Sequence, residues 1–398
     1  MPTGLSTRQL TVLILGLMAT GVGQSLVFAI LAPLGREVQL SELQITSLIA
    51  SSALVYGLTA PLWGRVSDRV GRKPIIITGL IAYCIGTVVF TSVFLAGLTG
   101  VLSGTALYIA LIVSRWCQAA IMSASNPAST AYAADHTDRD QRTKTMARLG
   151  TANSMGTILG PAVSGALATF GLLAPLYFAA GLAAMSGLLV WRALPPGDPS
   201  HRVKRDLKRK LSYTDRRIAL FLACAFGIFI GFSGIQQTLG FQLQDKMGLT
   251  GIETAQLTGA ALMVSATFTF IVQLTVMQRL KLRPTLFIRL GLVSLLLGAG
   301  IISVFNTFAV LAVGMAFLGA GMALCMPSIA AGASLAVKPE EQGAAAGLVA
   351  ACPPLGFAVG PVTAGALYQV ESSLAPLFSA AVFFAVLLAI AIHERRLA

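Results

Sequence analysis

Long apolar runs alternate with short polar segments along the whole 398-residue chain. An α-helix needs about 20 predominantly apolar residues to cross the hydrocarbon core of a bilayer, and each of roughly twelve runs comes close to or exceeds that length. The pattern therefore predicts an all-α membrane protein with twelve transmembrane helices. The expected spans are 9–33, 44–63, 75–98, 103–126, 145–169, 172–192, 217–240, 252–277, 286–305, 307–333, 343–368 and 373–392.

Composition agrees with a membrane protein and disfavours an enzyme. Hydrophobic residues make up 56% of the chain and charged residues only 11%, whereas a soluble domain carries about 25% charged residues. The five cysteines are scattered through apolar runs and the three histidines fall at polar borders, without the spacing of a metal or redox site. The expected spans hold neither histidine nor acid, so a membrane enzyme or receptor is disfavoured. We expect no catalytic residues, no metal and no cofactor.

The positive charges are distributed unevenly between the two sides of the expected spans. The chain has 28 Lys and Arg against 15 Asp and Glu, a net charge of +13, which in a soluble protein would favour nucleic-acid binding. Here alternate polar segments collect nearly all the cations, and the other side keeps only Arg36 and Lys246. The positive-inside rule then places both termini in the cytoplasm. We expect a multi-pass protein of the cytoplasmic (inner) membrane, with the lipid bilayer and no nucleic acid as its partner.

An internal repeat divides the chain into two halves. Gly156, Gly160 and Pro161 recur 200 residues later as Gly356, Gly360 and Pro361. Parallel repeats of this kind build secondary transporters from two six-helix halves. The expected organisation is an N-terminal six-helix bundle over 1–193, a cytoplasmic linker over 194–216 and a C-terminal six-helix bundle over 217–398. The basic part of the linker could lie on anionic lipid headgroups or could simply be solvated.

The polar segment between the second and third spans carries a distinctive motif. Residues 64–74 read G-R-V-S-D-R-V-G-R-K-P, and its glycines would permit tight turns. The pattern G-x-x-x-D-R-x-G-R-K resembles motif A of the major facilitator superfamily, in its drug-efflux, drug/proton antiporter branch with twelve helices. The pattern A-D-x-x-x-x-x-Q-R after the fourth span resembles the segment that pairs with motif A in that family. The resemblance implies a conformational latch on the cytoplasmic face, formed by Gly64, Asp68, Gly71, Arg72, Asp135 and Arg142.

The fifth span resembles a second motif of this family. Gly156, Gly160, Pro161 and Gly165 follow the pattern G-x-x-x-G-P-x-x-S-G, which is similar to the antiporter motif C. Ser164 stands where the family has a second glycine of the final pair, and small residues also pack membrane helices without setting a direction of transport. The resemblance implies export.

Arg115 is the one cation inside an expected span. The run Arg115-x-x-Gln118 in the fourth span resembles motif B of the family, with Ala119 in place of its glycine. A cation at the middle of a membrane costs roughly 2.5–3.5 kcal/mol on insertion scales, so it normally faces a cavity and a partner. Two roles stay open for Arg115: a substrate-binding or proton-linked site, and a structural arginine bonded to Gln118 and backbone carbonyls.

Amides and a tyrosine inside the spans could line a central cavity. They are Gln24, Tyr56, Gln236 and Gln237, with the last two placed opposite the repeat position of Gln24. A cavity lined in this way suits an amphipathic solute, although each side chain could instead bond between helices.

The resemblance covers the whole chain and implies secondary active transport by alternating access, with a proton gradient as the driving force. The first span lacks the acid that many multidrug antiporters carry, so a border acid or the substrate itself could handle the proton. A lone Arg115 favours a small anionic or zwitterionic solute, for example a carboxylate siderophore or a drug-like molecule. The alternative is proton-coupled uptake of a siderophore or an organic acid. We expect a monomer.

Overall fold

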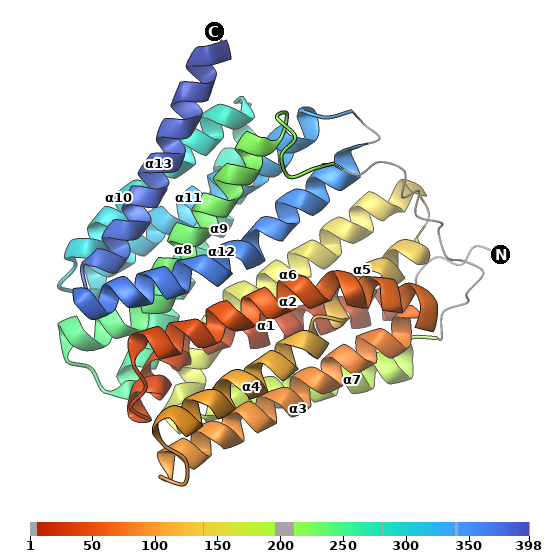
Figure 1. The fold of residues 1–398 in the computed structure, drawn as a ribbon. Helices are drawn as coiled ribbons and strands as arrows, with labels where there is room; N and C mark the ends of the chain where they lie inside the picture. Colours follow the sequence, from red (N-terminus) through yellow and green to blue (C-terminus); the bar gives the residue numbers. More distant parts are fainter. Residues whose placement is uncertain (1–5, 138, 196–210, 281, 339–340, 398) are drawn as a thin grey trace. The chain divides into compact units, whose positions relative to one another are not determined.

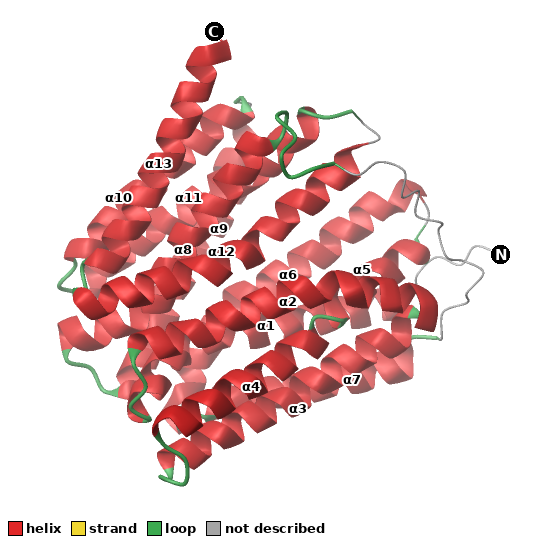
Figure 2. Cartoon of the chain, in the orientation of Figure 1, coloured by secondary structure: helices red, strands yellow, loops and turns green. Residues whose placement is uncertain are grey.

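The computed structural model describes residues 6–137, 139–195, 211–280, 282–338 and 341–397, and all regular structure within these ranges is helical (Figures 1 and 2). The helices are α1 (Thr7–Glu37), α2 (Glu42–Val70), α3 (Arg72–Leu98), α4 (Gly104–Met122), α5 (Ser125–Asp135), α6 (Arg139–Leu167), the short 3₁₀ helix η1 (Ala168–Phe170), α7 (Ala174–Ala193), α8 (Ala219–Met247), α9 (Gly251–Arg279), α10 (Pro284–Val304), α11 (Phe308–Leu335), α12 (Gln342–Val370) and α13 (Leu374–Leu397).

Local side chains fix where the first two long helices begin. The Ser6 hydroxyl accepts from the backbone N–H of Gln9 at 3.2 Å, and the Gln9 side chain accepts from the Ser6 N–H at 2.9 Å. Ser41 and Gln44 repeat this reciprocal pair before α2. Each pair satisfies N–H groups that have no partner inside the helix, so these polar residues define the ends of the apolar runs.

Eleven helical segments in the described part of the chain are long and apolar enough to cross a membrane, with α4 and α5 counted as one. They match eleven of the twelve expected spans. The remaining expected span, 145–169, forms α6, which begins earlier, at Arg139. Its first turns are charged and polar, which lowers its mean hydropathy below that of the other helices. The all-helical membrane fold predicted from the apolar runs is confirmed.

The fourth span is longer than predicted and is broken. It continues past residue 126 to Asp135, with a turn at Ser123 and Ala124 between α4 and α5. Pro127 has no N–H to donate, so the helical hydrogen bonding cannot run through this point. The Ala124 N–H bonds instead to the Ile121 carbonyl, three residues earlier, at 3.0 Å.

The chain divides into two compact units, with a boundary between Arg205 and Asp206. Unit 1 comprises Met1–Gln44, Ser51–Arg205 and Thr250–Gly259, and unit 2 comprises Ile45–Ala50, Asp206–Leu249 and Ala260–Ala398. The basic part of the expected linker, 196–210, lies outside the described residues.

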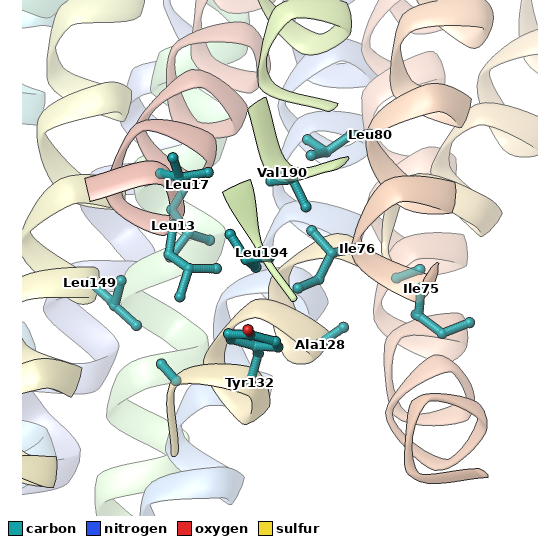
Figure 3. Close-up of a cluster of buried hydrophobic side chains, with 13 residues drawn as sticks. Leu13, Leu17, Ile75, Ile76, Leu80, Ala128, Tyr132, Leu149, Val190 and Leu194 are labelled. Carbon is teal, nitrogen blue, oxygen red and sulfur yellow. The ribbon is translucent and has the colours of Figure 1, made fainter. Parts of the chain in front are cut away.

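A buried apolar cluster holds together the helices of unit 1 (Figure 3). Leu13 and Leu17 of α1 meet Ile76 and Leu80 of α3 in this cluster, and Tyr132 of α5 is fully buried beside them. Side chains at spacings of three and four residues lie on one face of a helix, which explains why these pairs point inward together. The cluster anchors the helices that carry the polar residues described below.

The repeat seen in the sequence is also present in the packing. Ser25 of α1 places its hydroxyl 3.5 Å from the carbonyl oxygen of Gly156 on α6, and Ser233 of α8 places its hydroxyl 3.3 Å from that of Gly356 on α12. Each half therefore uses the same serine-to-glycine contact between its first and fifth long helices.

Candidate substrate-binding site

Arg115 is held by neighbouring side chains of unit 1. Its Nη1 donates to Oε1 of Gln118 at 2.6 Å, one helical turn along α4. Gln118 is itself buried, and its Nε2 donates to Oγ1 of Thr87 on α3 at 2.7 Å. The guanidinium lies 5.3 Å from the ring centroid of Phe90, a geometry in which the aromatic face attracts a cation. The structural contact to Gln118 that the sequence left open is therefore present.

Two buried hydrogen-bond donors beside this chain have no partner. They are Nε of Arg115 and the hydroxyl of Tyr83, both without a protein acceptor among the described residues. Tyr83 is 3% exposed, and a methyl group added at Gly23 of α1 would collide with its ring and hydroxyl. A buried donor that lacks an acceptor costs about 1–3 kcal/mol, so these groups favour a ligand that brings oxygen atoms. Sequence reasoning missed Tyr83 because nothing in its own run distinguishes it.

Tyr56 joins two other predicted site residues. It makes side-chain hydrogen bonds to Gln24 of α1 and to Asn126 of α5. Tyr56 also packs against the buried group formed by Tyr83, Met122 and Ala183. The structure thus brings Gln24, Tyr56, Arg115 and Gln118 into one connected region of unit 1, as the sequence predicted for residues that line a single site.

Gln236 and Gln237 lie on α8 in unit 2 and form a separate polar group. Oε1 of Gln236 and Nε2 of Gln237 are buried without partners in the described part of the chain, as is Oε1 of Gln242. The sequence placed the first two opposite Gln24 in the repeat, and that register is wrong. Because Ser25 corresponds to Ser233 in its contact, Gln24 corresponds to Phe232. The glutamines of α8 therefore lie about one turn further along their helix.

Motif A forms the junction of two helices. α2 continues to Val70 and α3 begins at Arg72, so Gly71 alone is non-helical, with φ 112°. That conformation strongly favours glycine. Gly64 lies inside α2 with open space around it, so the tight turn predicted at Gly64 is absent.

Arg72 connects the acids of the expected latch. Its Nε lies 2.9 Å from Oδ2 of Asp135, and its Nη1 lies 2.5 Å from Oδ1 of Asp68. Nη1 also donates to the Ser67 hydroxyl at 2.7 Å. The side chains of Arg72 and Asp135 are largely buried, whereas that of Asp68 is 46% exposed. Arg142 lies on α6. These contacts tie the end of α2, the start of α3 and the end of α5 together.

The glycines of motif C let α6 approach α1. A methyl group added at Gly156 would lie 2.9 Å from the backbone nitrogen of Val22, and one at Gly160 would lie 2.6 Å from the Val22 carbonyl oxygen. Gly160 and Pro161 are buried, and Gly165 lies on the same helix. Because α1 carries Gln24, the motif supports a helix of the candidate site as well as packing the bundle.

Comparisons with known proteins agree with the fold and the motifs. A sequence model of the Major Facilitator Superfamily matches residues 13–301 and 283–396. The chain belongs to this superfamily. Multidrug resistance protein 2 of Bacillus subtilis (strain 168) is 26% identical over 376 residues, which cover 90% of this chain and 88% of that protein. Tetracycline resistance protein, class C, of Escherichia coli is 31% identical over 188 residues, 46% of this chain and 44% of that protein.

Solved structures show the same fold. The crystal structure of the nucleoside transporter NupG superposes with a TM-score of 0.74 and 14% sequence identity, over 97% of this chain and 99% of that one. As a member of the Major Facilitator Superfamily, the protein is a multi-pass membrane transporter of small molecules and not an enzyme.

This superfamily member has a second arginine clasp that sequence reasoning missed. In unit 2, Arg217 pairs with Asp215 at 2.7 Å and with Glu341, at the start of α12, at 2.8 Å. We had expected a charged clasp in the N-terminal half alone, because the repeat copy of motif A near Pro284 lacks an acid. The second clasp uses residues outside that copy, and no motif signalled their proximity.

Proposed function

We propose that the protein exports a small amphipathic solute that is anionic or zwitterionic, by alternating access. One observation carries the proposal: Arg115 is held inside a membrane-crossing helix by Gln118 and Phe90 rather than by a carboxylate. The guanidinium keeps its charge, and its Nε and the Tyr83 hydroxyl remain available as donors. A carboxylate or another oxygen-rich group would satisfy both donors and neutralise the charge.

The relatives favour export over uptake. Proteins whose names state multidrug or tetracycline resistance match long stretches of this chain, and resistance of this kind follows from efflux. The motif C pattern around Gly160 points in the same direction. A carboxylate siderophore remains one substrate that fits the proposed chemistry, and uptake of such a molecule or of an organic acid is the competing proposal.

We infer a proton gradient as the driving force, with an acid at the membrane border as the carrier of the proton. Asp245, at the end of α8, accepts a hydrogen bond from the Tyr368 hydroxyl of α12 at 2.6 Å, and is a border carboxylate linked to a second helix. The proposal further places the halves at 1–193 and 217–398, joined by a linker at 194–216, in a monomer of the inner membrane with both termini in the cytoplasm, where the cations concentrate.

The test is transport by purified protein in liposomes. Tetracycline, which is zwitterionic, and a fluorescent fatty-acid analogue, which is anionic, serve as probes, with ethidium as a cationic control. We expect a pH gradient to drive the first two probes against the direction of proton flow, and counterflow to occur without a gradient. Movement of both probes with the protons would establish uptake and overturn export. Transport of ethidium alone would overturn the anionic or zwitterionic assignment.

A further inference from the structure

A large apolar groove lies between α3 and α4 in unit 1, outside the polar contacts described above. Its volume is about 730 Å³, within the range of roughly 300–1,000 Å³ that ligand pockets occupy. Its lining includes Ile81, Ile85 and Val89 of α3 together with Val113, Cys117 and Gln118 of α4.

The bilayer is the source of any occupant of this groove. Both helices are long and apolar enough to cross a membrane, and Ile85, Val89 and Val113 are exposed along their central turns. Side chains exposed at this depth meet hydrocarbon rather than water. The one polar side chain of α4 beside Gln118 in the lining, Ser114, donates to its own helix at the Leu111 carbonyl. The groove therefore suits a hydrocarbon chain.

Gln118 connects the groove to the candidate site. It belongs to the lining of the groove and also accepts from Arg115. The close approach depends on Gly86, because a methyl group there would lie 2.6 Å from Cγ of Gln118. A molecule whose chain fills the groove would have its other end beside the amide that holds the buried arginine.

We propose that the α3–α4 groove binds the hydrocarbon chain of an anionic amphiphile that the protein takes from the bilayer, with the anionic head beside Gln118. The inference rests on the proposed transport of an amphipathic solute and specifies its apolar part. Solutes of this class would reach Arg115 from the side, between two helices of the same unit. Binding energy would come mainly from the buried chain, at about 0.8 kcal/mol per CH₂ group.

Photolabelling with a fatty acid tests the groove directly. Purified protein in liposomes is irradiated with a 16-carbon fatty acid that carries a diazirine at mid-chain, and the adducts are located by mass spectrometry. We expect adducts within 81–93 and 110–121, and at least a fivefold loss of labelling in excess palmitate. Ala82→Phe and Ala110→Phe, which fill the groove from either helix, should each lower the labelling at least fivefold. Ile109→Phe, exposed on α4 outside the lining, should leave it unchanged.

Several outcomes would overturn the groove. One is labelling spread equally over other exposed helix faces, and another is labelling that persists in both groove-filling variants while they remain folded by circular dichroism and gel filtration. A phosphatidylcholine with the same photoreactive chain gives a further arm. If it labels the same residues and palmitate does not compete, the occupant is a structural lipid. Tetracycline transport separates the two proposals, since groove labelling without any transport contradicts only the proposed function, and transport without groove labelling contradicts only the groove.

Discussion

Arg115 donates to Gln118 at 2.6 Å, and this bond joins a charged side chain to a buried, neutral amide. Gln118 passes the interaction to Thr87 on the neighbouring helix α3. A hydrogen bond from a charged group is stronger than one between neutral groups, but it leaves the net positive charge in place. The arrangement fixes the position of the guanidinium and keeps its charge for an incoming anion.

We expect Arg115→Ala to abolish transport of the anionic and zwitterionic probes while the protein folds near normally. Arg115→Lys should not restore full transport, because lysine lacks the planar fork that binds a carboxylate by two hydrogen bonds. Counterflow in liposomes and the thermal midpoint in detergent separate the two effects. Arg36→Ala, which breaks an ion pair with Glu42 at the border of α1, is the control. Wild-type transport by Arg115→Ala would remove the residue from the site.

The two acids that pair with Arg72 should contribute unequally to stability. Asp135→Asn breaks a largely buried ion pair, and hydrogen bonds to charged groups contribute about 1.5–3 kcal/mol. Asp68→Asn breaks a half-exposed pair on adjacent turns, for which about 0.3–0.5 kcal/mol is typical. Thermal unfolding in detergent should therefore show the larger fall in midpoint for Asp135→Asn. If Asp68→Asn slows transport without a change in midpoint, its role as a latch gains support. Unchanged turnover in Asp68→Asn would restrict it to charge neutralisation.

Bulk at the α1–α6 contact should impair both packing and binding. Gly160→Leu pushes against the Val22 carbonyl, and overpacking typically costs about 1–3 kcal/mol. From sequence alone, substrate binding would be spared by this change. Since α1 also carries Gln24, we now expect affinity for the probes to fall together with turnover. Gly150→Ala on the same helix has open space around it and should fold and transport normally. Intact affinity in a folded Gly160→Leu protein would uncouple motif C from the site.

Gln237→Leu distinguishes a binding residue from a packing residue. The Nε2 group of Gln237 is buried without a partner among the described residues, so its replacement by an apolar side chain of similar size should leave stability equal or higher. If the amide binds substrate, the same change should weaken probe binding at least tenfold. Equilibrium binding and thermal unfolding of the purified variant measure both quantities. Stabilisation with unchanged affinity would exclude Gln237 from the site.

The arginine clasp of unit 2 should respond to acid. Hydrogen bonds from Arg217 lower the pKa of Asp215, and bonds to Asp215 and Glu341 raise the pKa of Arg217. Because the pKa of Asp215 is lower in the folded protein, its contribution to stability is present above the unfolded-state value of about 3.9 and is lost as pH falls through the lowered pKa. A ¹³C-carboxyl NMR titration should show Asp215 titrating below that value. Arg217→Gln should move the midpoint back towards it.

The sequence by itself determined the fold class and most of the helices. Apolar runs of membrane-spanning length have no stable alternative in a bilayer, because every backbone polar group must be bonded internally. That constraint is local to each run, which is why eleven of the expected spans could be read without any contact. The pairing of motif residues was also readable, since the charge order around Arg72 and Asp135 reports a junction of helices near polar solvent.

Only the tertiary structure decided how the polar side chains are joined. Tyr83 became visible because Gly23 makes room for its hydroxyl and because that hydroxyl has no acceptor. The register of Gln237 depended on which serine meets which glycine across a helix pair. Arg217 and Glu341 are 124 residues apart, and no local pattern encodes such a distance. Contacts of this kind depend on the packing of whole helices, where a shift of one residue rotates a side chain by about 100°, so the chain had to fold before they could be assigned.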